Sequence, residues 1–455
     1  MQVFGSSGAR GEVGAEFTPE FVLRVARAAA TVWDADRVAL GRDTRTTGQL
    51  FADAAAAGIA AAGTDVVRLG VAPTPATVRY CGDNAVPGVQ ITASHNPPEY
   101  NGVKLIGDDG SGLPVAALER VEEVLLSESG TDAAWDAVGA SHHADATEPY
   151  LATVEAAVDR AAIAEAGLTV AVDPGHGAAA ETSPTFFRRL GCEVVTVNAQ
   201  ADGHFPGRPS EPTPESLDDL GRLVRARGAD VGVAHDGDGD RAVFVDETGT
   251  AVSGDASLAA LAERALSPGD AVVSAVNVSQ RLVDVCDRVG ATMELTPIGA
   301  TNIVTRIRAL WGDGRTVPIA GEGNGGVFFP ADGLVRDGAL VAGRFLELLA
   351  AHEAPVSEVI EPYTSYHTVR ESVSYDDEAE RTALLDAAER FAETSDAEPE
   401  TTDGYRLDYG DAWLLVRESG TEPKLRVYAE SGDHDRAESL AARATSRLHE
   451  ARETT

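Results

Sequence analysis

The chain has 455 residues, and its 37 basic and 73 acidic side chains give a formal charge of −36. Only two of the basic residues are lysines, Lys104 and Lys424, and this arginine-dominated, carboxylate-rich composition indicates a halophilic protein that stays hydrated at high salt. The charge excludes nucleic acid and anionic membranes as partners, because both require a basic face.

An apolar strand, a polar loop, an amphipathic helix and a second apolar strand recur three times along the chain. The first copy spans residues 37–70, with strands near Val38 and Val66, and the others span 168–198 and 270–297. Units of this kind predict parallel strand pairs covered by helices on both faces of a sheet. We expect each copy to form the centre of one α/β domain.

The pattern changes after about Tyr363. An alternating strand at 366–375, a helix through Arg390, paired strands at 405–417 and a last helix indicate an α+β domain. The length also favours about three or four domains. We therefore predict three similar α/β domains with mixed, mostly parallel sheets and a smaller C-terminal α+β domain around a central cleft. The predicted boundaries are 1–148, 149–253, 254–363 and 364–455.

The segment TASHNPPEYNGVKL, residues 92–105, is the first that suggests chemistry. A serine hydroxyl is a poor nucleophile unless it is activated, so Ser94 beside His95 fits a plain hydrogen-bonded turn equally well when the segment is taken alone. Two prolines stiffen the loop. The pair Asn101-Gly102 is expected to turn the chain so that Lys104 comes back over the serine.

The segment HDGDGDR, residues 235–241, follows an apolar strand and alternates three aspartates with two glycines. Asp236, Asp238 and Asp240 can fold around one hard cation, while the glycines relieve backbone crowding. A hairpin turn is the alternative, but carboxylates at alternate positions repel one another unless a cation neutralises them. An EF-hand is rejected because Arg241 stands where that loop needs glycine. Three carboxylates leave coordination positions open for Mg²⁺ to share with a phosphate oxygen.

The segment GEGNGG, residues 321–326, brings the chain close to a ligand through its glycines. Glu322 can accept hydrogen bonds from sugar hydroxyls, and Asn324 can accept or donate them. Alone, the motif is weak, and a simple glycine turn is the more frequent explanation.

The segment RESGTEP, residues 417–423, carries groups that bind phosphate. Arg417 supplies a guanidinium fork, Ser419 and Thr421 supply hydroxyls, and the backbone around Gly420 supplies N–H groups. The alternative is a solvated polar hairpin tip.

The four loops fall one in each predicted domain, and over essentially its full length the chain resembles the α-D-phosphohexomutases. Four-domain members of that family carry a T-A-S-H-N-P phosphoserine loop, a D-G-D-G-D-R metal loop, a G-E-x-S-G sugar loop and an R-x-S-G/N-T phosphate loop. Three of these match here without a break. The opening FGSSGARG and the RDG at residues 336–338 also fit the family pattern.

The resemblance implies two phosphoryl transfers. A phosphoserine adds about −2 charge, which Mg²⁺ neutralises, and gives its phosphoryl group to a hexose phosphate. The resulting 1,6-bisphosphate turns around, and the serine takes back the other phosphoryl group. The implied catalytic residues are Ser94, Lys104 as proton shuttle, Arg10 and His95. The implied metal ligands are Ser94, Asp236, Asp238 and Asp240. The implied substrate-binding residues are Arg241, Glu322, Asn324, Arg417, Ser419, Gly420 and Thr421.

The sugar loop departs from the usual family form, because Asn324, Gly325 and Gly326 stand where most members have Ser and then Gly-His. This form is similar to the archaeal branch, which includes phosphoglucosamine mutases and phosphomannomutase/phosphoglucomutases. We therefore expect conversion of glucosamine 6-phosphate to glucosamine 1-phosphate, with mannose or glucose phosphates as the alternative. A sugar-phosphate phosphatase and a non-catalytic sensor are the competing classes.

The remaining expectations concern the environment of the protein. Three widely spaced cysteines predict neither a disulfide framework nor a zinc site. The sequence shows no signal-peptide pattern and no apolar run of about 18 residues, so we expect a cytoplasmic enzyme. It is expected to be a monomer or homodimer that acts on a small hexose phosphate, with hexose 1,6-bisphosphate as activator and intermediate.

Overall fold

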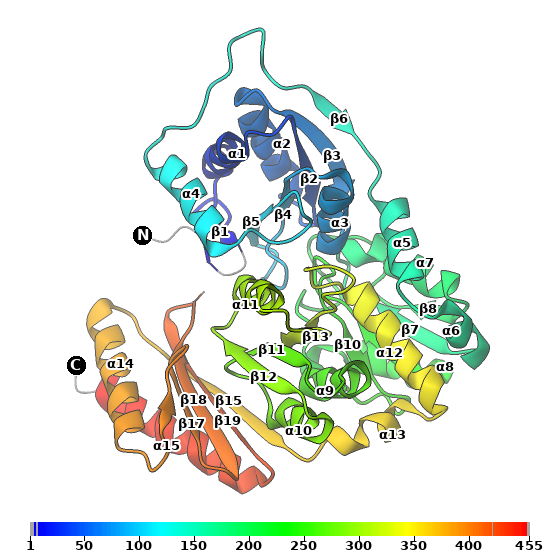
Figure 1. Cartoon of the computed structure of the whole chain (residues 1–455), viewed down its shortest axis with the longest axis vertical. Coiled ribbons are helices and arrows are strands. Elements are labelled where there is room, and N and C mark those ends of the chain that lie inside the picture. Colours follow the sequence, from blue (N-terminus) through cyan, green and yellow to red (C-terminus); the bar gives the residue numbers. More distant parts are fainter. Residues whose placement is uncertain (1–3, 6–7, 421, 453–455) are drawn as a thin grey trace. The chain divides into compact units, whose positions relative to one another are not determined.

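The computed structural model describes residues 4–5, 8–420 and 422–452 (Figure 1). Its contacts define two compact units. The first unit comprises Met1–Ala265 with Pro318–Glu361, and the second comprises Leu266–Val317 with Pro362–Thr455. Residues of the third predicted domain thus contribute to both units.

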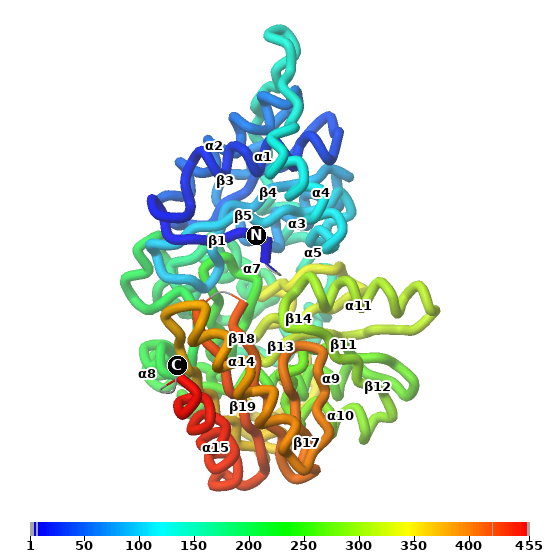
Figure 2. The backbone as a smooth tube through the Cα atoms, turned by 90° about the vertical axis from the view of Figure 1, so that its left-hand side faces the viewer, coloured from blue at the N-terminus to red at the C-terminus, as the bar shows by residue number. Residues whose placement is uncertain are grey.

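The first sheet of unit one has the strand order β1-β5-β4-β2-β3-β6. Strands β2, β3, β4 and β6 pair in parallel, as the first repeat predicts, whereas β5 pairs antiparallel with both β4 and β1. The labels β1, β3, β4 and β5 locate this sheet in Figure 2. Its strands are β1 Ala9–Glu12, β2 Arg37–Arg42, β3 Asp65–Val71, β4 Gly88–Ile91, β5 Tyr100–Ile106 and β6 Ser141–His143.

Helices cover both faces of this sheet, because alternate strand residues face opposite sides. Val38 and Leu40 lie in one buried cluster with residues of α1, α2 and α4, whereas Ala39 lies in another with residues of α3. These helices are α1 Pro19–Trp33, α2 Gly48–Ala61, α3 Thr74–Asn84 and α4 Val115–Leu126, and α5 Thr147–Ala156 follows β6 in the chain.

The second sheet of unit one has the order β10-β9-β7-β8, with the outer strand β10 antiparallel and the others parallel. Its strands are β7 Thr169–Asp173, β8 Glu193–Thr196, β9 Val231–Ala234 and β10 Val243–Val245, and the helices beside it are α6 Arg160–Ala166, α7 Ser183–Arg189 and α8 Asp218–Arg227. Unit one also contains α9 Gly254–Ala265, the hairpin β13 Ile319–Glu322 and β14 Gly326–Phe328, α12 Gly338–His352 and α13 Val356–Ile360.

Unit two combines the third repeat with the C-terminal domain. The repeat consists of β11 Ala271–Ala275, α10 Gln280–Val289, β12 Thr292–Thr296 and α11 Ala300–Gly312, with β11 and β12 parallel. The C-terminal sheet has the order β15-β19-β18-β17-β16 and is antiparallel throughout. Its elements are β15 His367–Ser374, α14 Glu378–Glu393, β16 Pro399–Glu400, β17 Tyr405–Asp408, β18 Ala412–Glu418, β19 Lys424–Ser431 and α15 His434–Arg452.

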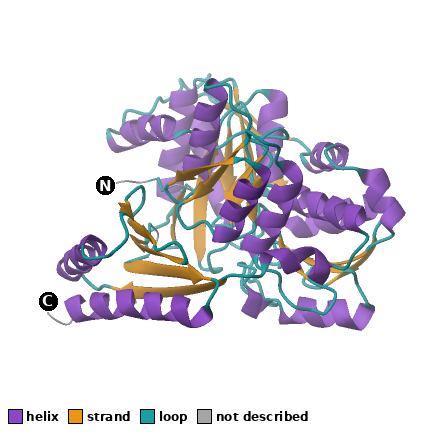
Figure 3. Ribbon diagram, turned by 60° about the horizontal axis from the view of Figure 1, so that its bottom comes forward, coloured by secondary structure: helices purple, strands orange, loops and turns teal. Residues whose placement is uncertain are grey.

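Helices α14 and α15 both cover one face of the C-terminal sheet (Figure 3). The other face presents Trp413, Leu415 and Tyr428 to Val276, which follows β11. Buried Glu430 accepts hydrogen bonds there from the Trp413 indole and from the Arg281 guanidinium. The mixed α/β domains and the smaller C-terminal α+β domain confirm the predicted fold class.

One local expectation is wrong. Asn101 and Gly102 do not turn the chain but lie inside β5, and the turn occupies residues 94–99 instead. The reason is steric, since a Cβ at Gly102 would lie 2.6 Å from the Thr92 carbonyl oxygen and 2.8 Å from that of Ala9. Glycine therefore allows β5 to pack tightly between its two neighbours.

None of the helices formed by the described residues combines the length and apolar character needed to cross a bilayer.

The aromatic contact between Phe17, which precedes α1, and Phe51 in α2 yields a stability prediction. Phe51 is fully buried, and its ring centroid lies 4.8 Å from that of Phe17. We expect Phe51→Ala to lower the free energy of unfolding by about 3–5 kcal/mol, because it removes this packing and leaves a cavity. Denaturant unfolding measures the loss. Leu50→Ala is the matched control, since its side chain is 53% exposed and should cost less than about 0.5 kcal/mol. Equal losses for the two variants would contradict the assignment of Phe51 to the core.

Candidate active site

Ser94 lies just beyond the end of β4 and is fully buried. Its hydroxyl donates a hydrogen bond to Asp236 Oδ2 at 2.8 Å, across 142 residues of sequence. Its backbone N–H donates to Thr92 Oγ1 at 2.8 Å, and its φ of +52° is in the left-handed region. This conformation is uncommon for a residue with a side chain and often marks a functional site.

The loop between β9 and β10 brings Asp236, Asp238 and Asp240 together, with carboxylate oxygens within 4.8 Å of one another. A glycine makes this approach to the serine possible, since a Cβ at Gly237 would lie 2.5 Å from the Ser94 carbonyl oxygen. Thr74, at the start of α3, fastens the loop by donating its hydroxyl to Asp238 Oδ2 at 2.5 Å.

Burial and mutual repulsion dominate the electrostatics of the three carboxyl groups. Burial, followed by the charges of Asp240 and Asp238, raises the pKa of Asp236 to about 8. Burial also acts to raise the pKa of Asp238, but the hydrogen bonds and charge of Lys104 bring it below its ordinary value. Arg336 and Lys104 outweigh burial at Asp240 and hold its pKa well below the usual range.

The carboxylates retain unused donor atoms suited to a metal. Oδ1 of Asp238 and Oδ1 of Asp240 are buried, and neither accepts a hydrogen bond from any part of the chain that the structure describes. Buried polar atoms are normally satisfied, so these two oxygens point to a ligand. An all-oxygen donor set is the one that hard divalent cations prefer.

Two neighbouring strands, β1 and β5, carry cationic side chains near this cluster. In the β1–β5 register Arg10 lies opposite Gly102, and in the β4–β5 register Gln90 lies opposite Lys104. Lys104 Nζ then lies 2.6 Å from Asp238 Oδ2 and 3.2 Å from Asp240 Oδ2. Arg10 Nη1 donates to the Asn96 side chain at 2.9 Å. Burial lowers the pKa of Arg10 to about 10.

His95 and Arg241 form a further contact between the serine loop and the aspartate loop. Arg241 Nη2 donates to His95 Nδ1 at 2.8 Å. Burial, with Arg241 and Arg10 nearby, keeps the pKa of His95 far below its ordinary value, so the imidazole is neutral. Arg241 Nη1 also lies 3.3 Å from Glu211 Oε1.

The glycine loop lies at the tip of the β13–β14 hairpin, where Glu322 pairs with Gly326. Asn324 Oδ1 accepts the Gly326 N–H at 3.0 Å, which leaves its NH₂ group to donate. Arg336, outside the residues that we singled out as the site, connects this loop to the aspartates. Its guanidinium lies 2.8 Å from Asp240 Oδ2 and 3.5 Å from Glu322 Oε2. The RDG motif is the sequence signal that could have identified it.

The segment predicted to bind phosphate lies in unit two, where Arg417 belongs to the end of β18 and Ser419 and Gly420 follow that strand. Ser419 N donates to the Lys424 carbonyl at 2.9 Å, and Arg417 Nε lies 3.1 Å from Asp403 Oδ1. Gly420 belongs to the same loop, whereas Thr421 falls outside the described residues.

Comparison with known proteins places these loops in one family. Models of the phosphoglucomutase/phosphomannomutase family match in chain order, with α/β/α domain I at residues 1–131, domain II at 148–249, domain III at 253–366 and the C-terminal domain at 373–446. The chain belongs to the phosphoglucomutase/phosphomannomutase family.

Relatives of this phosphohexomutase align over nearly their whole length. A phosphoglucomutase/phosphomannomutase of Thermococcus kodakarensis is 39% identical, and the alignment covers 96% of each chain. A phosphoglucosamine mutase of Methanococcus maripaludis is 32% identical, with 97% of each chain covered. The crystal structure of a phosphoglucomutase/phosphomannomutase family protein from Burkholderia thailandensis has a TM-score of 0.85 at 26% identity, covering 99% of this chain and 97% of that one. Phosphohexomutase is thus the enzyme class, as the loop motifs predicted.

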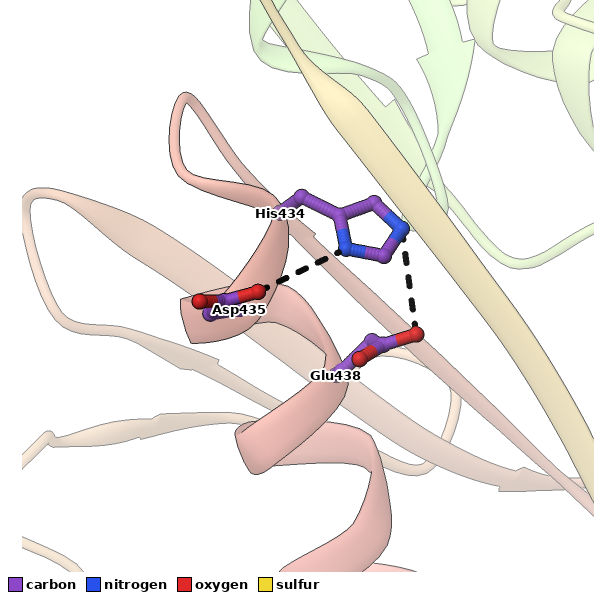
Figure 4. A group of neighbouring side chains, drawn as sticks. All are labelled: His434, Asp435 and Glu438. Carbon is purple, nitrogen blue, oxygen red and sulfur yellow. Dashed lines mark ion pairs between the residues drawn. The ribbon is translucent and has the colours of Figure 1, made fainter.

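A second group of possible metal ligands in this phosphohexomutase consists of His434, Asp435 and Glu438 at the start of α15 (Figure 4). All three side chains are exposed, and the two imidazole nitrogens of His434 face different carboxylates at 3.9 and 3.8 Å. This arrangement is typical of weak surface ion pairs. The buried aspartates remain the better metal site.

The raised pKa of Asp236 predicts how metal binding to the phosphohexomutase depends on pH. Below pH 8 the metal-free site holds a proton on Asp236 that a cation must displace, so affinity should rise with pH and level off above about 8. We expect the association constant for Mg²⁺ to increase about tenfold per pH unit below that value, measured calorimetrically on dephosphorylated protein. Asp236→Asn should abolish this slope, and Asp132→Asn, at an exposed ion pair, should retain it. Affinity independent of pH between 6 and 8 in the parent would contradict the prediction.

Proposed function

We propose that the chain interconverts the 6-phosphate and 1-phosphate of a hexose through a phosphoserine at Ser94 and a hexose 1,6-bisphosphate. The observation that carries this proposal is the 2.8 Å hydrogen bond from Ser94 Oγ to Asp236, which puts a buried hydroxyl against a buried carboxylate cluster. A buried serine without chemistry would not require three repelling carboxylates beside it.

The reaction divides into two balanced transfers. In the first, the bond between phosphorus and Ser94 Oγ breaks and a bond to the free hydroxyl oxygen of the hexose phosphate forms; the sugar hydroxyl proton passes to a base, and Ser94 Oγ takes up a proton. After the 1,6-bisphosphate has turned around, its other phosphoryl group returns to Ser94 Oγ, which gives up its proton, and the sugar oxygen that is released takes up a proton. The serine ends each cycle phosphorylated, so the net reaction is an isomerisation.

Asp236, Asp238 and Asp240, together with an oxygen of Ser94, are the residues that would hold Mg²⁺. When bound, the cation supplies charge neutralisation and polarises the phosphoryl group. The Oδ1 atoms of Asp238 and Asp240, which accept no hydrogen bond from the described residues, support this assignment.

We assign proton transfer to Lys104, which projects from β5 toward the carboxylates and has Nζ 2.6 Å from Asp238. Arg10, which donates to the Asn96 side chain, and His95, which follows the serine, are assigned supporting roles. Neutral His95 accepts a hydrogen bond from Arg241 through Nδ1, which leaves Nε2 for the substrate. Arg241 orients the substrate or its phosphate.

Substrate recognition is assigned to two further loops. Glu322 would accept from sugar hydroxyls, and Asn324 would donate to them through its NH₂ group. Arg417, Ser419, Gly420 and Thr421 would bind the phosphate that is not being transferred.

Glucosamine phosphate is the proposed substrate, with mannose and glucose phosphates as the alternative. The support is the G-E-x-N-G-G form of the sugar loop and the Methanococcus maripaludis relative named phosphoglucosamine mutase. The Thermococcus kodakarensis relative, named phosphoglucomutase/phosphomannomutase, favours the alternative. Parallel turnover assays on the 6-phosphates of all three sugars would decide between them, and preference for mannose or glucose would overturn the choice of glucosamine.

Replacing the nucleophile tests the phosphoserine. We expect Ser94→Ala to lose one phosphoryl group by intact-mass spectrometry and to lose mutase activity, because no oxygen remains to carry the group. Ser129→Ala, an exposed serine, should keep both. An active Ser94→Ala variant that still carries the phosphoryl group would rule out Ser94.

Replacing Asn324 tests the sugar loop. The oxygens at positions 3 and 4 have the same configuration in glucose, glucosamine and mannose, so a loop that reads them cannot distinguish these sugars. We expect Asn324→Ala to lower kcat/KM for all three phosphates by a similar factor. That factor should correspond to a loss of about 1–2 kcal/mol of transition-state stabilisation. A change of about tenfold or more in the ratio between glucosamine and mannose phosphates, roughly 1.4 kcal/mol, would show instead that the loop reads position 2.

A further inference from the structure

Arg45 is a buried cation that the sequence motifs did not single out. It lies in the connection between β2 and α2, and its side chain is completely removed from solvent. Arginine is seldom fully buried unless every donor has a partner. The partners of Arg45 therefore indicate what it does.

The guanidinium of Arg45 holds the serine loop by its carbonyl oxygens. Nη2 donates to the carbonyls of Ser94 at 2.9 Å and of Asn96 at 2.6 Å. Nη1 donates to the carbonyls of Pro97 at 2.5 Å and of Tyr100 at 2.9 Å. One side chain thus binds four carbonyls within seven residues of the loop that carries the nucleophile.

Asp43 connects Arg45 to the residues that precede Ser94. Its Oδ2 accepts from Arg45 Nε at 3.1 Å and from the Thr92 hydroxyl at 2.6 Å. The Thr92 hydroxyl oxygen in turn accepts the Ser94 N–H at 2.8 Å. The peptide groups before and after Ser94 are therefore both attached to the Asp43–Arg45 ion pair.

Residues of the domain that contains the second sheet also contact Arg45 and the serine loop. The Phe205 ring centroid lies 5.2 Å from Arg45 Cζ, and Ser210 Oγ donates to the Asn96 carbonyl at 2.8 Å. Both residues belong to the segment between β8 and α8, whose sheet also supplies the aspartate loop. The serine loop is thus fixed to the same domain as the carboxylates that Ser94 faces.

This attachment matters because the serine is held in an unfavourable conformation. A non-glycine residue with φ near +52° persists only where its surroundings determine it. A planar fork with five N–H donors can bind several carbonyls in fixed directions, whereas the lysine ammonium has three donors and no fixed plane. Transfer to and from Oγ requires the oxygen to stay aligned, and small displacements of reacting groups are costly.

We propose that Arg45 is a positioning residue for phosphoryl transfer: by fastening the carbonyls of Ser94, Asn96, Pro97 and Tyr100 it holds Ser94 Oγ in its reactive direction. The inference rests on the proposed role of Ser94 as nucleophile. Among the described residues, the Arg45 guanidinium donates hydrogen bonds to backbone carbonyls and to Asp43, not to the serine hydroxyl, so its effect on the reaction is indirect.

The experiment compares Arg45→Met, Arg45→Lys, Asp43→Asn and the double variant Asp43→Asn/Arg45→Met. The double variant removes the unpaired Asp43 charge that Arg45→Met leaves buried. Asp43→Asn alone keeps the carbonyl contacts. Ile59→Ala, in the core beneath the same sheet, is the stability-matched control. Each protein is assayed with glucose 1-phosphate after priming with glucose 1,6-bisphosphate, and its melting temperature and phosphoserine occupancy are measured.

We expect kcat to fall at least tenfold in both variants that carry Arg45→Met, with KM for glucose 1-phosphate changed less than threefold, because substrate-binding groups are untouched. Arg45→Lys should lie between them and the parent, and Asp43→Asn should lose less than Arg45→Met. Ile59→Ala should keep the parental kcat at a comparable drop in melting temperature. If Arg45→Met does not fold, the Arg45→Lys and Asp43→Asn comparison carries the test.

Two outcomes overturn the proposal. One is a kcat within twofold of the parent in Arg45→Lys and in every folded variant that carries Arg45→Met. The other is a loss of activity that follows melting temperature equally in the Arg45 variants and Ile59→Ala. Failure of the proposed function is distinguishable, because the primed parent itself would then carry no phosphoryl group on Ser94.

Discussion

The mutual repulsion of three buried carboxylates is the constraint on which the first unit depends. Asp236, Asp238 and Asp240 lie too close together to be stable as free charges, and each is compensated differently. Asp236 holds its proton up to about pH 8, whereas Lys104 and Arg336 neutralise the other two. The cations come from separate parts of the chain, so the cluster can form only when both sheets and the β13–β14 hairpin are in place.

The need to bring cations and carboxylates together accounts for the direction of β5 and for two glycines near the cluster. Strand β5 runs antiparallel to its neighbours in an otherwise parallel sheet, which places Lys104 beside the carboxylates. Gly102 and Gly237 remove the Cβ atoms that would keep the strands and loops apart. The pairing of strands thus serves the electrostatic balance as well as the packing of the core.

The local patterns were sufficient to predict the repeats, the change to α+β architecture and the paired strands at 405–417, because each depends on residues close in sequence. The same patterns could not predict contacts between segments that are distant in sequence. Thr74 is 164 residues from Asp238 and has no motif of its own, and Arg45 resembles any polar residue of a surface turn until its four carbonyl partners are known. The turn predicted at Asn101-Gly102 was wrong for a related reason. An Asn-Gly pair is a turn signal, but here the glycine is needed inside β5 for close packing against the neighbouring strands. The placement of the third repeat in a unit with the C-terminal domain likewise depends on buried side chains such as Glu430, whose partners are more than 60 residues away in several cases.

The positive φ of Ser94 also restricts which amino acid can occupy the position. Threonine carries an equivalent hydroxyl, and chemistry alone would accept it as a nucleophile. A β-branched side chain in the left-handed region crowds its own backbone, however, and is a far rarer event than serine there. The backbone conformation therefore favours serine over threonine independently of any bound phosphate. Stereochemistry, and not reactivity, disfavours the conservative substitution of Ser94 by threonine.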